Sequence, residues 1–407
     1  MIRFIHTADL QLGMRAGQSG ECAERLREAR FTALERIVHL ARDEEVDFVL
    51  IAGDMFEDNQ VGTRTVARAV QLLQAAAPIT VFILPGNHDW WDAGSVYRRR
   101  EFSDAQTGNI TVLSEPAPVE FADGCTLYPC PVTERWSYLD PTTWIPPRED
   151  DAQIRIGVAH GTLPTMADER ILPIETDVAV RNGLDYLALG HTHGLRLFES
   201  GRMAYCGTPE QTSFGEDGAG SVLLVSIESG QPPQIEVRQI GSLTWLTWER
   251  EVAEPVEEAL DALRNEIHAL EDGAHTLLRL RLRGTVAADN LPLVREFEAW
   301  LDARCENGQL LFAGIESDLR TSEELAGALR TLAAHDQVIA GAIADLQSLA
   351  TPEEAAPEGV EGVAPRDRGE LTRTWLETDP PDAEQLSSAD VAREALGILA
   401  ELAGEVE

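Results

Sequence analysis

The segment from Ile79 to Asp89 constrains the fold of this chain more than any other. A run of apolar residues, Ile79–Leu84, leads directly into the polar turn Gly86-Asn87-His88-Asp89. Valine, isoleucine and phenylalanine favour a buried strand, and glycine favours a turn after it. Folding alone does not require asparagine, histidine and aspartate at such a turn. A polar surface turn is the simplest interpretation of one segment, so its meaning depends on whether other strand ends carry partners for it.

Four other predicted strands end in residues of the same kind. The five predicted strands are Ile2–His6, Val46–Ala52, Ile79–Leu84, Ile154–Ala159 and Leu184–Leu189, and the residues after them are Asp9 with Gln11, Asp54 with Glu57, Asn87 with His88, His160, and His191 with His193. In open α/β sheets, ligand sites lie outside the carboxyl ends of the strands. We therefore expect these side chains to converge. A lone histidine at a strand end is commonly just hydrogen-bonded, but that explanation would have to apply at every one of these ends.

Helical segments alternate with the predicted strands. Residues Glu21–Glu44 and Thr63–Ala77 have apolar side chains at three- and four-residue spacing, which predicts amphipathic helices. A further strand is predicted at Arg202–Cys206, and two apolar strands close this part of the chain before Ile240. Short strands that alternate with helices predict a layered α/β domain, which we assign to residues 1–240.

A smaller unit with the same alternation is predicted at residues 241–320. Its elements are strand Thr244–Glu251, helix Val256–Leu270, strand Thr276–Arg283, helix Leu291–Cys305 and strand Gln309–Ile315. Strict alternation in the middle strand places Arg279, Arg281 and Arg283 on one face. The solvated face of a half-covered sheet is the simpler interpretation of this row, and a row of phosphate contacts is the alternative.

The last part of the chain predicts two helical segments joined by a linker. Residues 321–350 carry leucine and isoleucine at four- and three-residue spacing, which is typical of a helix with a heptad-like packing seam. Residues 351–381 are rich in Pro, Gly, Ala and Glu and predict a flexible linker. Residues 382–407 predict a C-terminal amphipathic helix, which either folds back on its own domain or docks on a partner helix.

Four aromatic residues stand out in the proline-rich stretch between residues 116 and 147. They are Tyr128, Trp136, Tyr138 and Trp144. We interpret them as packing residues rather than as a platform on which nucleic acid bases stack.

Composition limits the setting of the protein without identifying its substrate. A chain of 407 residues is long enough for two or three domains. The net charge of −37 should keep the protein soluble and repel nucleic acid, and all 33 basic residues are arginine. No apolar run is long enough for a membrane span, and no secretory signal precedes the first strand. Five scattered cysteines predict reduced thiols, so we expect a cytoplasmic location and no membrane association.

The residue types at the strand ends indicate a pair of metal ions. Carboxylate, amide oxygen and imidazole without thiolate suit Mn²⁺, Fe²⁺ or Zn²⁺ pairs better than a structural zinc. A carboxylate such as Asp54 can bridge two ions. Two ions about 3.5–4 Å apart hold both oxygens of an in-line phosphoryl displacement. The strand ends therefore predict a phosphoryl-transfer site.

The set of motifs resembles the calcineurin-like metallophosphoesterase superfamily. The motifs are Asp9 with Gln11, Gly-Asp-Met-Phe ending at Phe56, Gly-Asn-His-Asp ending at Asp89, His160, and Gly-His-Thr-His ending at His193. The opening His6-Thr-Ala-Asp9 and the Gly-Asp-Met-Phe motif resemble the SbcD branch of DNA-repair nucleases. The resemblance implies a four-layer αββα sandwich followed by a small α/β capping domain and C-terminal helices.

The resemblance also implies roles for individual residues. One metal would be held by Asp9, Gln11, Asp54 and His193, and the other by Asp54, Asn87, His160 and His191. His88 would stabilise the transition state or protonate the leaving oxygen, which suits a histidine beside two cations. The implied cofactors are two divalent ions, with Mn²⁺ first and Fe²⁺, Mg²⁺ or Zn²⁺ as alternatives.

Two positions depart from the family pattern. The family usually has histidine at the position of Gln11, and it often has a second catalytic histidine at the position of Glu57. We keep Glu57 as a candidate catalytic residue that shuttles protons. The arginines Arg98, Arg99 and Arg100 are candidates for substrate phosphate, although a charged helix start explains them equally well.

The preferred function is a two-metal phosphodiesterase that cleaves DNA as an exonuclease or endonuclease in DNA repair and recombination. The resemblance implies an SbcC-like ATPase of the SMC family as partner, with a nuclease homodimer inside a heterotetramer, and residues 382–407 as the docking segment. Two alternatives stay open. One is a small-molecule or nucleotide phosphodiesterase of the same fold, and the other is a weakly active or non-catalytic subunit, because of Gln11 and Glu57.

Overall fold

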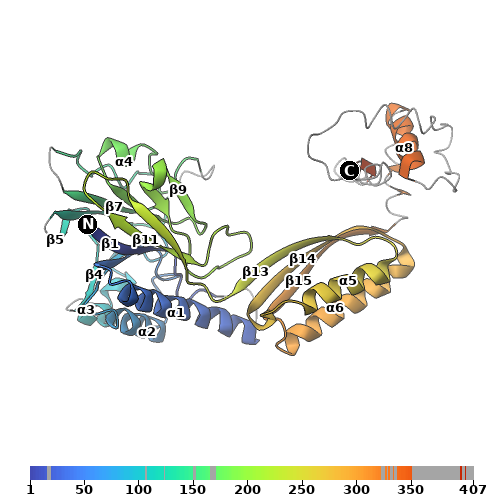
Figure 1. The fold of residues 1–407 in the computed structure, drawn as a ribbon, viewed down its shortest axis with the longest axis horizontal. Coiled ribbons are helices and arrows are strands. Elements are labelled where there is room, and N and C mark those ends of the chain that lie inside the picture. The colour runs from blue at the N-terminus through green and yellow to red at the C-terminus, as the bar shows by residue number, and fades with distance from the viewer. Residues whose placement is uncertain are drawn as a thin grey trace. The chain divides into compact units, whose positions relative to one another are not determined.

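The computed structural model describes residues 1–15, 20–105, 108–122, 124–149, 153–165, 171–321, 326–327, 329–330, 333, 337–350, 395–396 and 399. Two compact units divide the chain (Figure 1). The first comprises Met1–Thr247, Asp272–Leu278 and Leu310–Phe312, and the second comprises Trp248–Glu271, Arg279–Gln309 and Ala313–Glu407.

The first unit contains two six-stranded sheets. The first sheet has the order β12-β11-β1-β2-β3-β4, with β1 (Ile2–Thr7), β2 (Phe48–Ala52), β3 (Thr80–Leu84), β4 (Ile110–Val112), β11 (Ser221–Ile227) and β12 (Gln234–Gln239). Strands β1 to β4 run parallel, and β11 pairs with β1 in the antiparallel direction. The carboxyl ends of β1, β2 and β3 therefore lie at one edge of this sheet.

The second sheet brings a further set of parallel strand ends. Its order is β5-β6-β7-β8-β10-β9, with β5 (Val119–Ala122), β6 (Cys125–Cys130), β7 (Ile154–His160), β8 (Tyr186–Gly190), β9 (Arg196–Phe198) and β10 (Met203–Tyr205). Strands β6, β7, β8 and β10 are parallel. The predicted strands are all found, and β4, β5, β6 and β9 are short strands that sequence periodicity did not predict.

Alternating side chains explain the layers of this unit. In β2, Val49 and Ile51 pack under α1 (Gly20–Asp43) and α2 (Thr63–Gln74), whereas Phe48 and Leu50 face the second sheet. The outer face of the second sheet packs against α4 (Val178–Arg181) and neighbouring loops. Figure 1 shows α1 and α2 on one side of the sheets and α4 on the other. The predicted mixed α/β fold class is confirmed.

The second unit has the predicted order of strands and helices. Its sheet has the order β13-β14-β15, and its elements are β13 (Thr244–Glu251), α5 (Val256–His268), β14 (Thr276–Val286), α6 (Leu291–Glu306) and β15 (Phe312–Thr321). In β14, Leu278, Leu280 and Leu282 are fully buried, and the arginines between them face the other way. Arg281 and Arg283 pair with Glu316 and Glu249 at 2.8 and 2.6 Å, so this face neutralises its own charge and favours the simpler interpretation of the row.

Part of the predicted C-terminal helical region is described. Helix α8 spans Gln337–Ala350, and Leu396 and Leu399 pack against Ile343 and Leu329. The packing favours the fold-back alternative for the C-terminal stripe at these two residues. The predicted linker at 351–381 and nearly all of 382–407 lie outside the described residues. Among the helices of the described part, none has both the length and the apolar character needed to cross a membrane.

Shorter helical segments complete the chain. They are α3 (Arg100–Ala105) and the 3₁₀ turns Val96–Arg98, Glu199–Gly201, Gly273–His275 and Ala288–Asn290.

Candidate metal centre

The turn after β3 is held in place by an aspartate whose role was not predicted. Asp89 is fully buried and accepts hydrogen bonds from the amides of Gly86 (2.7 Å) and Phe56 (3.0 Å) and from the Tyr97 hydroxyl (2.5 Å). Burial, reinforced by the charge of Asp54, raises the pKa of Asp89 to about 6. Asp89 thereby presents Asn87 and His88 outward at the strand end. The sequence hints at this role only through the position of Asp89 directly after Asn87 and His88.

Three of the candidate ligands lie on left-handed backbone. The φ angles of Asp9, Gln11 and Asp54 are 53°, 45° and 51°, a region that non-glycine residues seldom adopt. Backbone hydrogen bonds stabilise these turns: the Asp9 amide donates to Gly53 and the Gln11 amide to Asp54, both at 3.0 Å. Strained backbone of this kind clusters at functional sites.

The glycines beside these turns leave no room for a side chain. A Cβ atom at Gly86 would lie 2.1 Å from the Asp54 carboxylate, and one at Gly53 would lie 2.1 Å from Nδ1 of His160. Glycine is therefore required where the ends of β2, β3 and β7 meet.

His160, Asp54 and Asn87 form the centre of the site. His160 is fully buried, and its Nδ1–H donates to the Ala52 carbonyl at 2.9 Å. Its Nε2 lies 3.0 Å from Oδ1 of Asn87 and 3.3 Å from Oδ2 of Asp54. Asn87 Oδ1 also accepts from Nδ1 of His191 at 2.9 Å. Ligand atoms of Asp54, His160 and His191 lie within 4.8 Å of one another.

The first strand end joins the same cluster through His191. The His191 amide donates to both carboxylate oxygens of the buried Asp9, at 3.1 and 3.0 Å. His191 itself has a φ angle of 98°. The structure therefore brings together the ends of β1, β2, β3, β7 and β8, although the metal-binding role of each residue stays a prediction.

His193 lies between Gln11 and a carboxylate that the sequence did not reveal. Its Nε2 lies 3.1 Å from the Gln11 amide nitrogen, and its Nδ1 lies 2.7 Å from Oε1 of Glu216. Thr212 donates to Glu216 through its amide (2.7 Å) and its hydroxyl (2.5 Å), which fixes the carboxylate. A histidine whose Nδ1–H donates to a carboxylate presents Nε2 as a ligand atom. Glu216 is remote from every strand-end motif, so the sequence carried no signal for it.

Charge shifts the protonation of the central residues. Burial, the largest single cause, lowers the pKa of His160, but the charge and hydrogen bond of Asp54 together with Asp9 and the Ala52 carbonyl outweigh it and raise that pKa to about 9. Burial likewise raises the pKa of Asp54, but His160 and His88 together outweigh it and lower that pKa to about 2. Burial and the neighbouring His160 lower the pKa of His191 to about 4, and burial raises the pKa of Asp9 to about 6. In such a site a divalent cation can replace the protons of the imidazolium groups and be bound by the same carboxylates and imidazoles.

The candidate catalytic residues His88 and Glu57 are neighbours. Nδ1 of His88 lies 2.8 Å from the backbone carbonyl of Glu57 and 4.0 Å from its Oε1. The His88 amide donates to Oδ1 of Asp54 at 2.9 Å, which connects this pair to the centre. Desolvation raises the pKa of Glu57, and its Oε2 is a buried atom without a hydrogen-bond partner.

The three candidate substrate arginines have different surroundings. The guanidinium of Arg99 donates to the backbone carbonyls of Asn59 and Val61, which fixes the loop after β2. Arg100 is exposed and pairs with Asp104 at 3.3 Å. Arg98 is exposed and stacks over Trp91 at 4.1 Å from the ring centroid. Of the three, Arg98 is the one whose surroundings best leave it available to a phosphate.

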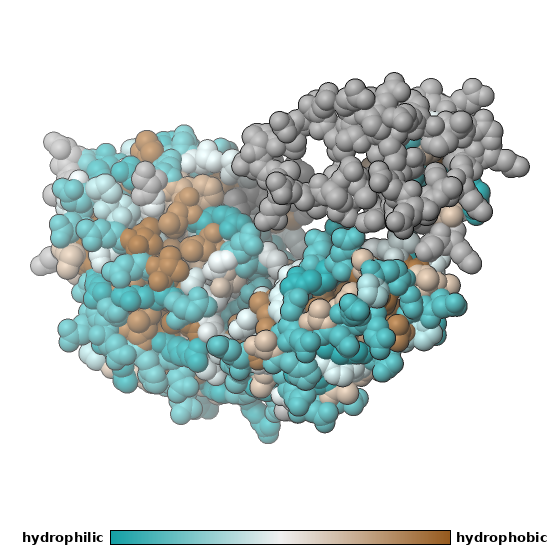
Figure 2. All heavy atoms as spheres, turned by 45° about the vertical axis from the view of Figure 1, so that its right-hand side comes forward, coloured by the Kyte–Doolittle hydropathy of each residue, from teal (hydrophilic) through white to brown (hydrophobic). Residues whose placement is uncertain are grey.

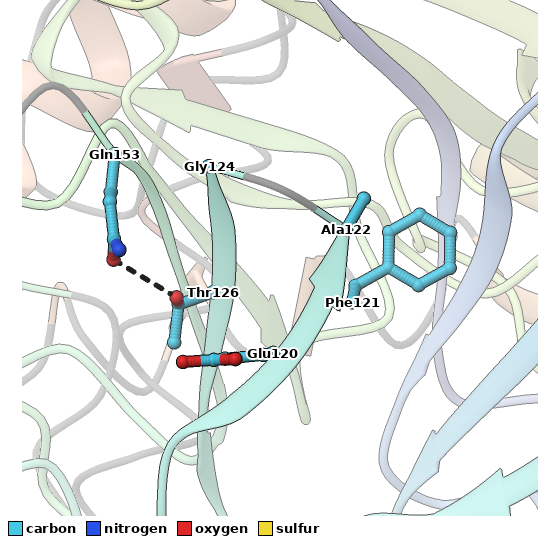
Figure 3. A pocket seen from close by; sticks show the side chains of 6 residues that line it. All are labelled: Glu120, Phe121, Ala122, Gly124, Thr126 and Gln153. Atoms are coloured by element: carbon cyan, nitrogen blue, oxygen red, sulfur yellow. Dashed lines mark hydrogen bonds between the residues drawn. The ribbon is translucent and has the colours of Figure 1, made fainter.

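A surface pocket elsewhere in the first unit is unrelated to this centre. It has a volume of about 340 Å³ and is lined by Glu120, Phe121, Ala122, Gly124, Thr126 and Gln153 (Figure 3). Gln153 precedes β7 and His160 ends it, so the pocket lies roughly 20 Å from the centre, at about 3.3 Å per residue.

Comparisons with known proteins find similarity to phosphoesterases over the first part of the chain. Residues 2–195 match the family model described as calcineurin-like phosphoesterase. The uncharacterized metallophosphoesterase YhaO of Bacillus subtilis (strain 168) is similar, with 26% identity over 309 residues that cover 70% of this chain and 72% of YhaO.

Solved structures show weaker similarity. The protein TT1561 of Thermus thermophilus has 12% identity and a TM-score of 0.38, covering 59% of this chain and 99% of its own. A dimetal phosphatase from Danio rerio has 14% identity and a TM-score of 0.37, covering 59% of this chain and 98% of its own.

Proposed function

We propose, on the premise that residues 2–195 form a calcineurin-like metallophosphoesterase domain, that this protein is a two-metal phosphodiesterase that cleaves DNA. One observation carries the proposal most directly. Oδ1 of Asn87 lies at hydrogen-bond distance from both His160 and His191, and Asp54 lies beside the same atoms. A cation that replaced the protons in these hydrogen bonds would be bound by oxygen and nitrogen atoms that already lie close together.

The chain's own residues divide the work of hydrolysis. Asp9, Gln11, Asp54 and His193 would hold one ion, and Asp54, Asn87, His160 and His191 the other. When bound, two such ions supply charge that stabilises the phosphoryl transition state and lower the pKa of water. Because the Glu57 carbonyl can only accept, Nδ1 of His88 carries a hydrogen. In its imidazolium form His88 also carries a hydrogen on Nε2. That proton would pass to the departing oxygen and leave the neutral ring with its hydrogen on Nδ1.

DNA is proposed as the substrate on the strength of the motif resemblance, with Mn²⁺ as the ion. The net charge of −37 opposes non-specific binding to a polyanion. An SMC-like ATPase partner is therefore proposed to contribute much of the binding affinity for DNA, in a complex with two nuclease subunits. DNA cleavage by the nuclease subunit alone should be weak for the same reason, most of all at low salt, where this repulsion is screened least.

The catalytic part of the proposal is tested with two substrates. Purified wild type with Mn²⁺ is expected to hydrolyse bis-nitrophenyl phosphate and to cleave linear DNA, and Asp54→Asn and His88→Ala are expected to abolish both activities. Asp43→Asn and His39→Ala, two exposed positions on α1, serve as matched controls that keep activity.

Each other outcome selects an alternative. Turnover of bis-nitrophenyl phosphate or cyclic nucleotides without any DNA cleavage would support a small-molecule phosphodiesterase. Fewer than two bound ions per chain, with no hydrolysis of either substrate, would support a non-catalytic subunit in which Gln11 and Glu57 mark a degraded site.

The partner is tested separately by removing residues 387–407. The truncated chain is expected to lose association with its neighbour-encoded ATPase and to keep metal-dependent hydrolysis. The truncation also removes the contacts of Leu396 and Leu399 with α8, so circular dichroism must confirm that the helical content of the rest is retained. Unchanged co-purification of the truncated chain would contradict the docking role.

A further inference from the structure

The loop after β6 carries exposed aromatic side chains. Trp136, Tyr138 and Leu139 are 58%, 76% and 77% exposed. Tyr128 and Trp144 behave differently, because their rings lie 6.0 Å apart and Tyr128 is buried. The packing interpretation is therefore confirmed for these two and is wrong for Trp136 and Tyr138. Figure 2 shows hydrophobic residues reaching a mostly hydrophilic surface.

Hydrogen bonds tie this loop to the strand ends that form the site. The Leu172 amide donates to the Ser137 carbonyl at 2.7 Å, and the Leu172 carbonyl accepts from the Thr162 amide at 2.9 Å. Each such step between neighbouring strands spans about 4.8 Å, so Ser137 lies roughly 10 Å from Thr162. Thr162 is two residues beyond His160.

The start of the loop is tied to the Asn87-His88 turn. The Val132 amide donates to the Pro85 carbonyl at 3.2 Å, and the Trp91 amide donates to the Val132 carbonyl at 2.8 Å. The backbone of the loop that carries the exposed aromatics is thus tied both to the turn after β3 and to the segment after β7. A strand of nucleic acid rises about 3.4 Å per nucleotide in a duplex, so the roughly 10 Å between Ser137 and Thr162 corresponds to about three nucleotides.

One carboxylate adds to these backbone hydrogen bonds. Asp140 accepts hydrogen bonds from the Thr142 amide (2.8 Å), the Thr142 hydroxyl (2.6 Å) and the Glu175 amide (3.3 Å). The backbone that carries the aromatics is therefore held at several points. A preorganised aromatic surface loses little conformational entropy on binding.

The chemistry of the loop suits the face of an unpaired base. A chain with a net charge of −37 does not attract a polyanion by its overall charge. Stacking does not depend on net charge, so it can still bind the bases of such a polyanion. The Arg135 guanidinium lies 5.5 Å from the Trp136 ring centroid, and arginine adds to base stacking through its own planar cation. Bases within a duplex already stack on their neighbours, so exposed rings bind those that are unpaired.

We infer that Trp136 and Tyr138 bind unpaired bases of the strand that is cut at the metal centre. The inference rests on the proposed DNA cleavage. It makes single-stranded DNA, or the frayed end of a duplex, the preferred substrate over blunt duplex. It also assigns the loop a role in holding the substrate and none in the chemical step.

The test measures binding of fluorescent single-stranded and blunt duplex oligonucleotides to the full chain. Wild type is expected to prefer the single strand, and Trp136→Ala and Tyr138→Ala each weaken that binding roughly 5- to 150-fold. Trp136→Phe keeps a ring and recovers most of the binding. Leu197→Ala, on β9 and 49% exposed, is the matched surface control and leaves binding unchanged. Hydrolysis of bis-nitrophenyl phosphate stays at the wild-type level in all four, which shows that the centre is intact.

A Trp136→Leu, Tyr138→Leu double variant separates stacking from simple apolar contact. It is expected to bind single strands as poorly as the alanine variants. The inference is overturned if the leucine or the alanine variants bind single-stranded DNA as tightly as wild type does. The proposed function still stands in that case, provided that wild type cleaves DNA. A wild type that hydrolyses bis-nitrophenyl phosphate but neither binds nor cleaves DNA would overturn both.

Discussion

The two sheets of the first unit contribute candidate ligands of different chemistry to one cluster. The ends of β1, β2 and β3 in the first sheet provide Asp9, Gln11, Asp54 and Asn87, which are carboxylates and amides. The ends of β7 and β8 in the second sheet provide His160, His191 and His193, which are all imidazoles. Neither sheet alone offers the mixed donor set that suits Mn²⁺ or Zn²⁺ pairs.

The two groups also differ in what holds them in place. Three of the oxygen donors lie on left-handed backbone turns that bond to one another, as the Asp9 amide does to Gly53. Two of the imidazoles are oriented by hydrogen bonds at their far nitrogens, His160 by the Ala52 carbonyl and His193 by the Glu216 carboxylate. A substitution cannot remove a backbone partner, but it can remove the side chain of Glu216. His193 is therefore the most tunable of the three imidazoles.

The largest effect is expected at Asp54, the carboxylate that is proposed to bind both ions. Asp54→Ala is expected to remove both ions and to lower bis-nitrophenyl phosphate hydrolysis at least about 1000-fold, because the bound ions supply several kcal/mol. Metal content after equilibration with Mn²⁺, together with initial rates, checks this. Asp43→Asn is the control, and two ions retained by Asp54→Ala would contradict the shared role.

A smaller effect is expected when the support of His193 is removed. Glu216→Ala should weaken one of the two Mn²⁺ sites by about 10- to 100-fold, because it frees the imidazole that Glu216 orients. The other site, around Asn87, His160 and His191, should keep its affinity. Titration calorimetry resolves the two, with Asp217→Ala as an exposed neighbouring control. Equal weakening of both sites would show that Glu216 acts on the whole fold.

The pH dependence should come mainly from the second sheet. The pKa of His160 is raised to about 9, so below that pH a cation must displace its proton. Release of one proton makes Mn²⁺ affinity rise about tenfold per pH unit up to about pH 9. Asp9, with a pKa raised to about 6, is ionised across most of this range and adds no slope above it. Calorimetric affinities measured at a series of pH values check the slope, and a flat profile would contradict it.

The smallest effect is expected from replacing Gln11 with histidine, the residue that the family pattern usually has at this position. An amide oxygen is a weaker ligand than imidazole, so Gln11→His should strengthen the ion held with Asp9 and His193 by up to about tenfold, or 1.4 kcal/mol. Gln74→His, an exposed position on α2, is the control for an added surface histidine. Weaker binding in Gln11→His would mean that the contact between Gln11 and His193 is itself part of the site.

Local sequence predicted the parts of the molecule that depend on local chemistry. Apolar runs and the glycine turns after them identified β1, β2, β3, β7 and β8, and therefore the strand ends that converge. Asp89 was adjacent to a predicted ligand, but its three hydrogen bonds come from Gly86, Phe56 and Tyr97, which only the folded chain brings together.

Other features depended on contacts distant in the sequence. Glu216 reaches His193 from a loop with no motif of its own, and Arg99 is occupied by carbonyls nearly 40 residues away. The aromatic residues between 128 and 144 look alike in sequence, and only burial separates the packed Tyr128 from the exposed Tyr138. Composition cannot separate them, because an aromatic ring suits both a core and a stacking surface.

The left-handed backbone at Asp9, Gln11, Asp54 and His191 has a consequence for how this chain can change over generations. For a residue with a side chain, that conformation costs roughly 1 kcal/mol or more, and glycine avoids the cost. Selection for thermal stability alone would therefore replace these residues with glycine. On the proposed ligand roles, a gene copy released from catalysis should lose these residues early, and their retention in a natural variant would mark continued selection for metal binding.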